Sequence, residues 1–182
     1  WITGPVKAEK IGMTDLANAG VFGEYTFTSG EKFSAIAGLR GDWFYRQGFK
    51  VSPRVTLKYM PVDEIVIRAN GGRGLRYSTP LVDNIGVFST GKEFVGSYDE
   101  HILEDAWTFG GNLTYYIPAG ATSNTYVSFD YFRTQFAQQM VVDYSMNQID
   151  FYALDGGQSF TDNYQLDFSI DPIERFNITT TF

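Results

Sequence analysis

The stretch Phe33-Ser-Ala-Ile-Ala-Gly-Leu-Arg-Gly-Asp-Trp-Phe-Tyr45 alternates in character with a period of two residues. One set of alternate positions is apolar or glycine, and the other set carries the charges, Arg40 and Asp42. Successive side chains of a β-strand point to opposite faces of the sheet, so this alternation indicates a strand with one apolar and one polar face. The same alternation recurs over residues 21–28, 54–60, 64–72, 106–117, 126–134, 159–170 and 176–182. We therefore expect about eight antiparallel strands and no helix.

The composition also favours an all-β chain. Of the 182 residues, 17% are aromatic, led by 16 Phe and 12 Tyr, and 19 are glycine. Aromatic side chains pack well on pleated sheets, and glycine suits turns and bulges. The formal net charge is −7 and no basic patch is evident, which argues against a nucleic-acid partner. The absence of cysteine excludes a disulfide framework and a thiolate metal site.

The connections between the expected strands alternate in length. Tight turns are expected at residues 28–32, 60–64 and 171–175, with a slightly longer one at 118–124. Longer connections lie between them, at residues 45–51, 75–104 and 135–150. Short turns on one rim and long loops on the other are typical of outer-membrane barrels. We therefore predict a barrel segment over residues 20–182 with long loops at about 75–104 and 135–150, preceded by an extracellular loop or irregular lead-in over residues 1–19.

The distribution of aromatic side chains favours a membrane barrel over a soluble one. The apolar faces carry no charge across their central windows, and they end in aromatic residues that would form girdles at the two membrane interfaces. These aromatics are Tyr25, Phe27, Tyr59 and Tyr115 near the turns, and Trp43, Tyr45 and Trp107 near the loops. The polar faces suit a wet lumen. Patterning alone leaves open a soluble β-domain with one exposed polar face.

A second stretch, Ile67-Arg-Ala-Asn-Gly-Gly-Arg-Gly-Leu-Arg-Tyr-Ser-Thr-Pro80, resembles a signature of TonB-dependent outer-membrane receptors. In that signature, a strand of the type (V/L)RASYGxGFRAP leaves the membrane and opens an extracellular loop. This chain departs from it at Leu75 and in the three residues that precede Pro80. The matching positions are Arg68, Gly72, Gly74, Arg76 and Pro80.

Three neighbouring motifs resemble the same family and occur in the family's order. Pro53–Tyr59 is similar to its "PR-x-x-x-x-Y" strand, and Leu103–Trp107 with Gly110 is similar to its "L-x-P-E-x-A-x-x-x-x-G" strand, without the proline. Val21–Tyr25 and Leu39–Asp42 resemble the pair "GVFGEY…AGLRxD". The resemblance thus extends over roughly residues 20–182.

This resemblance implies an antiparallel transmembrane β-barrel segment, about eight strands of a barrel of about 22 strands. It implies part of an outer-membrane receptor that imports a scarce nutrient of the ferric siderophore, cobalamin or haem class, with no enzymatic activity and no cofactor. The implied partners are outer-membrane lipid, a small-molecule ligand, the missing plug and remaining strands, and the TonB complex through the missing part. A chain that starts at Trp1 and lacks a plug suggests an excised piece.

The candidate contact residues cluster in and near the second stretch. Arg68, Arg73 and Arg76 are long cationic arms near the point where the chain leaves the sheet, and Tyr77 follows them. If they are lumenal, they can pair with plug carboxylates or with an anionic ligand, as can Arg40 and Asp42 of the first stretch. The alternative for Arg68 and Arg76 is that they anchor the interface between barrel and plug. Glycines at 71, 72 and 74 let the chain bend outward or pass close to a plug.

Catalytic and metal sites are not expected. His101 is the single histidine, and its acidic neighbours in the long loop are explained most simply as exposed loop charge. Two other functions stay open: a self-contained eight-stranded outer-membrane barrel with a structural or enzymatic role, and a soluble ligand-binding β-domain. Pairing of the first strand with the last would indicate the self-contained barrel.

Overall fold

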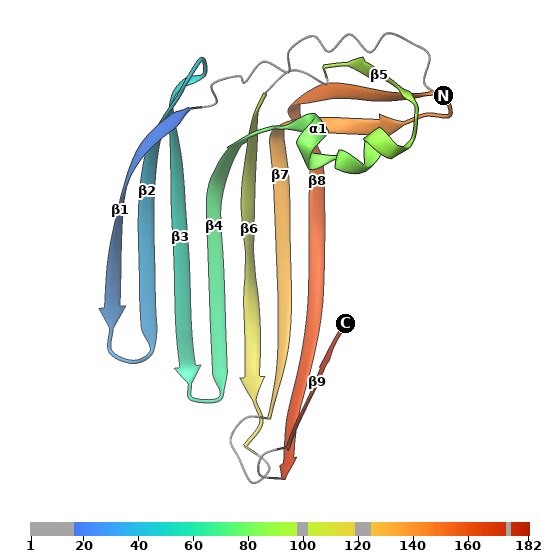
Figure 1. The fold of residues 1–182 in the computed structure, drawn as a ribbon. Coiled ribbons are helices and arrows are strands. Elements are labelled where there is room, and N and C mark those ends of the chain that lie inside the picture. Colours follow the sequence, from blue (N-terminus) through green and yellow to red (C-terminus); the bar gives the residue numbers. More distant parts are fainter. Residues whose placement is uncertain (1–16, 98–101, 119–124, 174–175) are drawn as a thin grey trace.

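The computed structural model describes residues 17–97, 102–118, 125–173 and 176–182, and their strands form one large sheet that is antiparallel except for one short strand (Figure 1). The strand order is β1-β2-β3-β4-β6-β7-β8, with β5 and β9 both paired to β8. The strands are β1 Asn18–Ser29, β2 Phe33–Phe44, β3 Gly48–Val62, β4 Ile65–Tyr77, β5 Glu93–Gly96, β6 Leu103–Tyr116, β7 Tyr126–Tyr144, β8 Gln148–Ile173 and β9 Phe176–Thr181. All eight predicted strands are present, with β5 in addition.

The register gives the sheet two distinct faces. Apolar residues stand opposite one another across neighbouring strands, as in Ala37↔Val55, Leu57↔Ala69 and Ile67↔Leu113. We call this side the apolar face; most of its large side chains are exposed. The other side, the polar face, carries a hydrogen-bonded network in which the Asn112 amide donates to Ser128 Oγ at 2.6 Å and Asp130 Oδ2 at 2.9 Å. The predicted alternation is therefore correct.

The sheet is open in the described part of the chain. β1 pairs with β2 alone, and the other end of the sheet is formed by β5 and β9 on β8. An open antiparallel sheet of this kind is what a segment of a larger barrel would form. The pairing of first and last strands that a self-contained eight-stranded barrel needs is not found among the described residues.

The two long connections contain more regular structure than predicted. Residues 75–104 include the end of β4, the short helix α1 Pro80–Asp83, the 3₁₀ turn η1 Ile85–Ser89, β5 and the start of β6. The predicted loop at 135–150 is mostly strand, because β7 runs to Tyr144 and β8 begins at Gln148. No helix in the described ranges is long and apolar enough to span a membrane. Of the predicted lead-in over residues 1–19, residues 1–16 lie outside the described residues.

A small apolar core explains why these connections are ordered. α1, η1 and β5 gather on the bent outer ends of β7 and β8, at the end of the sheet opposite the tight turns (Figure 1). We call this group, together with residues 138–155, the cap. β5 pairs in parallel with β8, from Glu93↔Gln148 to Gly96↔Phe151. The cap core consists of Val87, Met140, Ile149 and Phe151, with Leu81, Phe94, Ile102 and Val142 packed against it.

Candidate functional site

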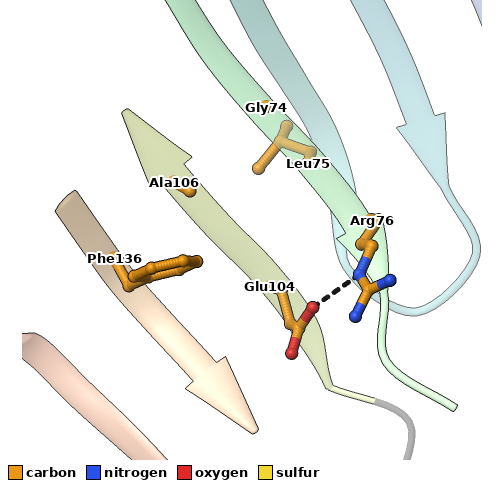
Figure 2. Close-up of a pocket in the computed structure, with 6 residues that line it drawn as sticks. All are labelled: Gly74, Leu75, Arg76, Glu104, Ala106 and Phe136. Carbon is orange, nitrogen blue, oxygen red and sulfur yellow. Dashed lines mark hydrogen bonds and ion pairs between the residues drawn. The ribbon is translucent and has the colours of Figure 1, made fainter. Parts of the chain in front are cut away.

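A cleft opens on the polar face where β4, β6 and β7 extend toward the cap (Figure 2). The register brings its walls together, because Arg76 stands opposite Glu104 and Ala106 stands opposite both Gly74 and Phe136. The cleft has a volume of ≈ 260 Å³. Its floor is apolar and its rim carries an ion pair, which suits a ligand with both apolar and charged groups.

Arg76 is the most accessible charged group of this cleft. Its Nε donates to Glu104 Oε2 at 2.7 Å, and its Nη2 lies 3.4 Å from Asp83 Oδ2 in α1. The hydrogen bond to Glu104 raises the pKa of the guanidinium above its usual value, so Arg76 stays cationic. The side chain is nevertheless 64% exposed. Arg76 therefore joins the wall to the cap and still presents a cation to the solvent.

Glu104 ties the same site to β7. Its Oε2 accepts from Arg76, while its Oε1 accepts from the backbone N–H of Met140 at 3.1 Å. The carboxylate thus bridges β4 and β7 from its position on β6, and its side chain is only 13% exposed. The sequence did not single out Glu104 as a contact residue. Its place opposite Arg76 follows from the register, which the sequence alone does not give.

Arg73 differs from the other candidate arginines in its position. The register places it opposite Trp107, which belongs to the apolar face, although Arg73 also lines a pocket with the polar-face residues Arg54 and Thr56. Its Nε and Nη2 donate to the two carboxylate oxygens of Asp105 at 2.8 and 2.6 Å. Its Nη1 donates to the Val51 carbonyl oxygen at 3.0 Å. Arg73 is thereby fixed between β3 and β6.

Tyr77 reaches across to the turn between β2 and β3. Its hydroxyl donates to the Tyr45 carbonyl oxygen, and its ring packs edge-to-face on Phe44 at 5.4 Å between centroids. Together, Arg73, Arg76 and Tyr77 lie on the last five residues of β4. The structure therefore places all three candidates at the outer end of one strand, with Arg73 and Tyr77 in register on the apolar face and Arg76 on the polar face.

Arg40 and Asp42 form a separate pair on the polar face of β2. Arg40 Nε and Nη2 donate to Asp42 at 2.7 and 2.8 Å, and Asp42 is only 3% exposed. Arg54 of β3 lies near them and makes a longer contact, 3.2 Å, with Glu24. Arg54 was not among the predicted contact residues, although it is the arginine of the Pro-Arg motif that begins at Pro53.

Arg68 is not part of the outer cleft. It lies on the polar face nearer the tight turns, where its Nη1 donates to Asn112 Oδ1 at 3.1 Å. It lines a separate pocket with Lys58 and Glu64. The candidate residues therefore fall into an outer group on β4, a pair on β2, and Arg68 by itself.

A second charged pair, besides Arg73 and Asp105, lies in register on the apolar face, where the sequence predicted none. Arg133 and Asp162 are opposite each other on the apolar face, in register with Phe109. Arg133 Nε and Nη2 donate to Asp162 at 2.7 and 2.6 Å, and the Phe160 ring lies 4.6 Å from the guanidinium carbon. Tyr131 donates to the same carboxylate at 3.0 Å. The expectation of an uncharged apolar face is thus wrong on β7 and β8, where mutual pairing lets the two charges occupy this face.

The described residues contain no group of three metal-binding side chains. His101 and its neighbours at 98–100 lie outside the described residues.

Comparison with known proteins extends these observations. The family model "TonB dependent receptor-like, beta-barrel" matches residues 9–149. No curated protein matches the sequence. The structure is similar to the ferric enterobactin receptor of Pseudomonas aeruginosa, with a TM-score of 0.64, 12% identity, and coverage of 90% of this chain and 26% of that chain. It is also similar to the siderophore receptor PirA of the same organism, with a TM-score of 0.64, 13% identity, and coverage of 91% of this chain and 34% of that chain. The chain thus spans about a third or less of the length of these receptors.

Proposed function

Because the chain belongs to the TonB-dependent receptor family and matches its β-barrel, we propose that it forms part of the wall of an outer-membrane receptor that imports a ferric siderophore. Cobalamin and haem are the other ligand classes that the sequence suggests. The observation that carries the proposal is the division of this open sheet into an exposed apolar face and a polar face of paired charges and amides. A barrel wall between lipid and a wet lumen has this arrangement.

Outer-membrane localisation is supported by where the aromatic side chains lie. Tyr59 and Tyr115 are exposed on the apolar face near the turns, and Trp43 and Trp107 are exposed on it toward the opposite end of the sheet. Aromatic residues of this kind anchor barrels at the two membrane interfaces. The two open sheet edges need further strands, because unpaired backbone groups are not stable in lipid. These strands, the plug and the contact with the TonB complex belong to the remainder of the receptor.

The ligand class is inferred from the cleft beside Arg76. A ferric siderophore of the catecholate kind combines aromatic rings with negative charge. The apolar cleft beside Ala106 and Phe136 suits the rings, and the exposed Arg76 guanidinium suits the charge. Of the similar structures, one is named a ferric enterobactin receptor and another a siderophore receptor. The chain acts by binding in this account, and it contributes no catalytic step.

The experiment measures ligand binding and uptake by the complete receptor in a bacterial strain that lacks its own siderophore receptors. The probe is ⁵⁵Fe-enterobactin, supplied to iron-starved cells with and without a functional TonB. We expect binding in both backgrounds and accumulation only when TonB is present. Haem and cobalamin are tested in parallel. Accumulation of haem or cobalamin without accumulation of ⁵⁵Fe-enterobactin would contradict the siderophore assignment.

Two arginine variants test the site itself. Arg76→Ala removes a charged hydrogen-bond donor, and loss of one such contact costs about 1.5 kcal/mol or more, so we expect about tenfold weaker ligand binding. Arg68→Ala is the matched control, because Arg68 is also exposed on the polar face but lines a different pocket. Equal binding by both variants and the unmodified receptor would show that Arg76 is not a ligand contact.

A further inference from the structure

The backbone pairing of the sheet is interrupted between β3 and β4. Pairing of these strands runs from Val62↔Ile65 to Arg54↔Gly72 and stops there. β3 nevertheless continues beside β2 to Gly48, and β4 continues beside β6 to Tyr77. Figure 1 shows β4 bending away from β3 toward α1 in this region.

Pro53 explains why the ladder stops. The N–H of Met60 donates to the Lys32 carbonyl oxygen, so even-numbered residues of β3 bond to β2, and the backbone groups of odd-numbered residues face β4. Pro53 therefore faces β4, and it has no N–H to donate. A Cβ added to Gly72 would lie 3.1 Å from the Pro53 carbonyl oxygen, which confirms that this carbonyl lies against β4.

Side chains of β4 bridge the gap beyond Pro53. If the register of Arg54↔Gly72 continued outward, Val51 would lie opposite Leu75. Instead, the Val51 carbonyl oxygen accepts from Arg73 Nη1 at 3.0 Å. The rest of the Arg73 guanidinium is held by Asp105 of β6. Further out, the Tyr77 hydroxyl donates to the Tyr45 carbonyl oxygen.

The break separates two groups of residues that are each held together internally. The hairpin unit, residues 42–53, is joined by the β2–β3 ladder. The cap unit, residues 73–77 with the cap, is joined by the β4–β6 ladder, by the Arg76–Asp83 contact and by Glu104 with the Met140 N–H. Between the units, Arg73 and Tyr77 replace a backbone ladder by side-chain contacts, which are easier to break.

We propose that β3 and β4 can separate at this break in the barrel wall, and that the contacts of Arg73 hold the hairpin unit against the cap unit. Arg73 is a positioning residue here, since it holds β4 against β3 and lines no part of the cleft beside Arg76. Gly74 and Arg76 line that cleft and belong to the cap unit, so parting of the wall moves the cleft with the cap. The inference goes beyond ligand uptake, and its test needs no ligand.

The first test measures distances between nitroxide spin labels in the complete receptor by pulsed electron paramagnetic resonance. The labels replace Gln47, in the hairpin unit, and Val82, in the cap unit, as Gln47→Cys and Val82→Cys; both positions are exposed. We expect Arg73→Ala to broaden the distance distribution and shift it to longer values. The matched control pair, Val82→Cys with Met146→Cys, lies within the cap unit and should not change. An unchanged distribution for the first pair in folded Arg73→Ala receptor would overturn the proposal.

The second test uses the unaltered receptor, so it holds even where Arg73→Ala fails to fold. The N–H of Tyr116 donates to the Glu64 carbonyl oxygen, so even-numbered residues of β4 bond to β6 and the odd-numbered ones face β3. The amide of Leu75 faces the break, whereas that of Arg76 belongs to the β4–β6 ladder. We expect hydrogen exchange at Leu75 to be at least about tenfold faster than at Arg76. Equal protection of the two amides would show that the wall is closed there.

Discussion

Replacing Phe151 by alanine is expected to open the cap without unfolding the barrel wall. The Phe151 side chain is 1% exposed and packs edge-to-face on Phe94 at 6.0 Å between centroids, beside Ile149 and Val87. Removal of a fully buried phenyl ring costs about 3–4 kcal/mol, from lost burial and the cavity that remains. The backbone contact from the Ser97 N–H to the Phe151 carbonyl oxygen, at 2.8 Å, does not depend on the side chain.

This cost falls on a small unit, so its effect is local. A free-energy loss of about 3 kcal/mol raises the ratio of open to closed cap by about 100-fold. Trypsin cleavage after Lys92 reports this opening, because Lys92 is held by its Nζ against the Ser145 carbonyl oxygen at 2.6 Å in the closed cap. The assay compares cleavage rates of the complete receptor in detergent micelles.

The matched control is Tyr152→Ala, which removes a 42% exposed ring from the next position of the same strand. We expect Tyr152→Ala to change the cleavage rate by less than about threefold. Equal rates for Phe151→Ala and Tyr152→Ala would refute the idea that the cap is stabilised by its own apolar core.

Two further predictions concern the apolar face. Val55→Arg places a charge on the exposed apolar face and should lower the free energy of unfolding by about 2–4 kcal/mol, measured by urea unfolding from liposomes. Thr56→Arg, on the polar face, should lower it by less than about 1 kcal/mol. Similar losses for both variants would contradict the assignment of the faces. Arg133→Leu alone should lower the yield of heat-modifiable, folded receptor more than the double change Arg133→Leu with Asp162→Leu. The single change leaves Asp162 without its cation on the apolar face, whereas the double change removes both charges. A lower yield from the double variant would show that the two charges do not depend on each other.

The strands could be predicted because their physical basis is local. Phe33–Phe44 alternates cleanly, and each of its polar residues falls on one face whatever the neighbouring strand is. The outer end of β7 and the start of β8 were not predicted, because local alternation is weak there. Gln138–Tyr144 alternates weakly, and its strand form depends on packing of Met140 and Val142 in the cap core with Phe151. Such contacts between segments far apart in the chain leave little local pattern.

The candidate site was predictable in part. The motif that ends at Pro80 correctly placed Arg73, Arg76 and Tyr77 at the outer end of a strand. Their partners were not predictable, because Glu104 and Asp105 are brought to them by the β4–β6 register. The face on which Arg133 lies could have been predicted, because Arg133 follows Val127, Phe129 and Tyr131 at the same period of two. That a charge is tolerated there depends on Asp162 standing opposite, which is again a matter of register.

The accessibility of single cysteines in intact cells reports which end of the sheet faces the outside of the cell. This chain contains no cysteine of its own, so Met146→Cys at the β7–β8 turn and Asp63→Cys at the β3–β4 turn can each be labelled alone, in a receptor freed of any other cysteine. We predict that a membrane-impermeant maleimide labels Met146→Cys in intact cells and labels Asp63→Cys only after the outer membrane is permeabilised. Labelling of both positions in intact cells, or of Asp63→Cys alone, would contradict the claim that this sheet is an outer-membrane wall with its cap outside.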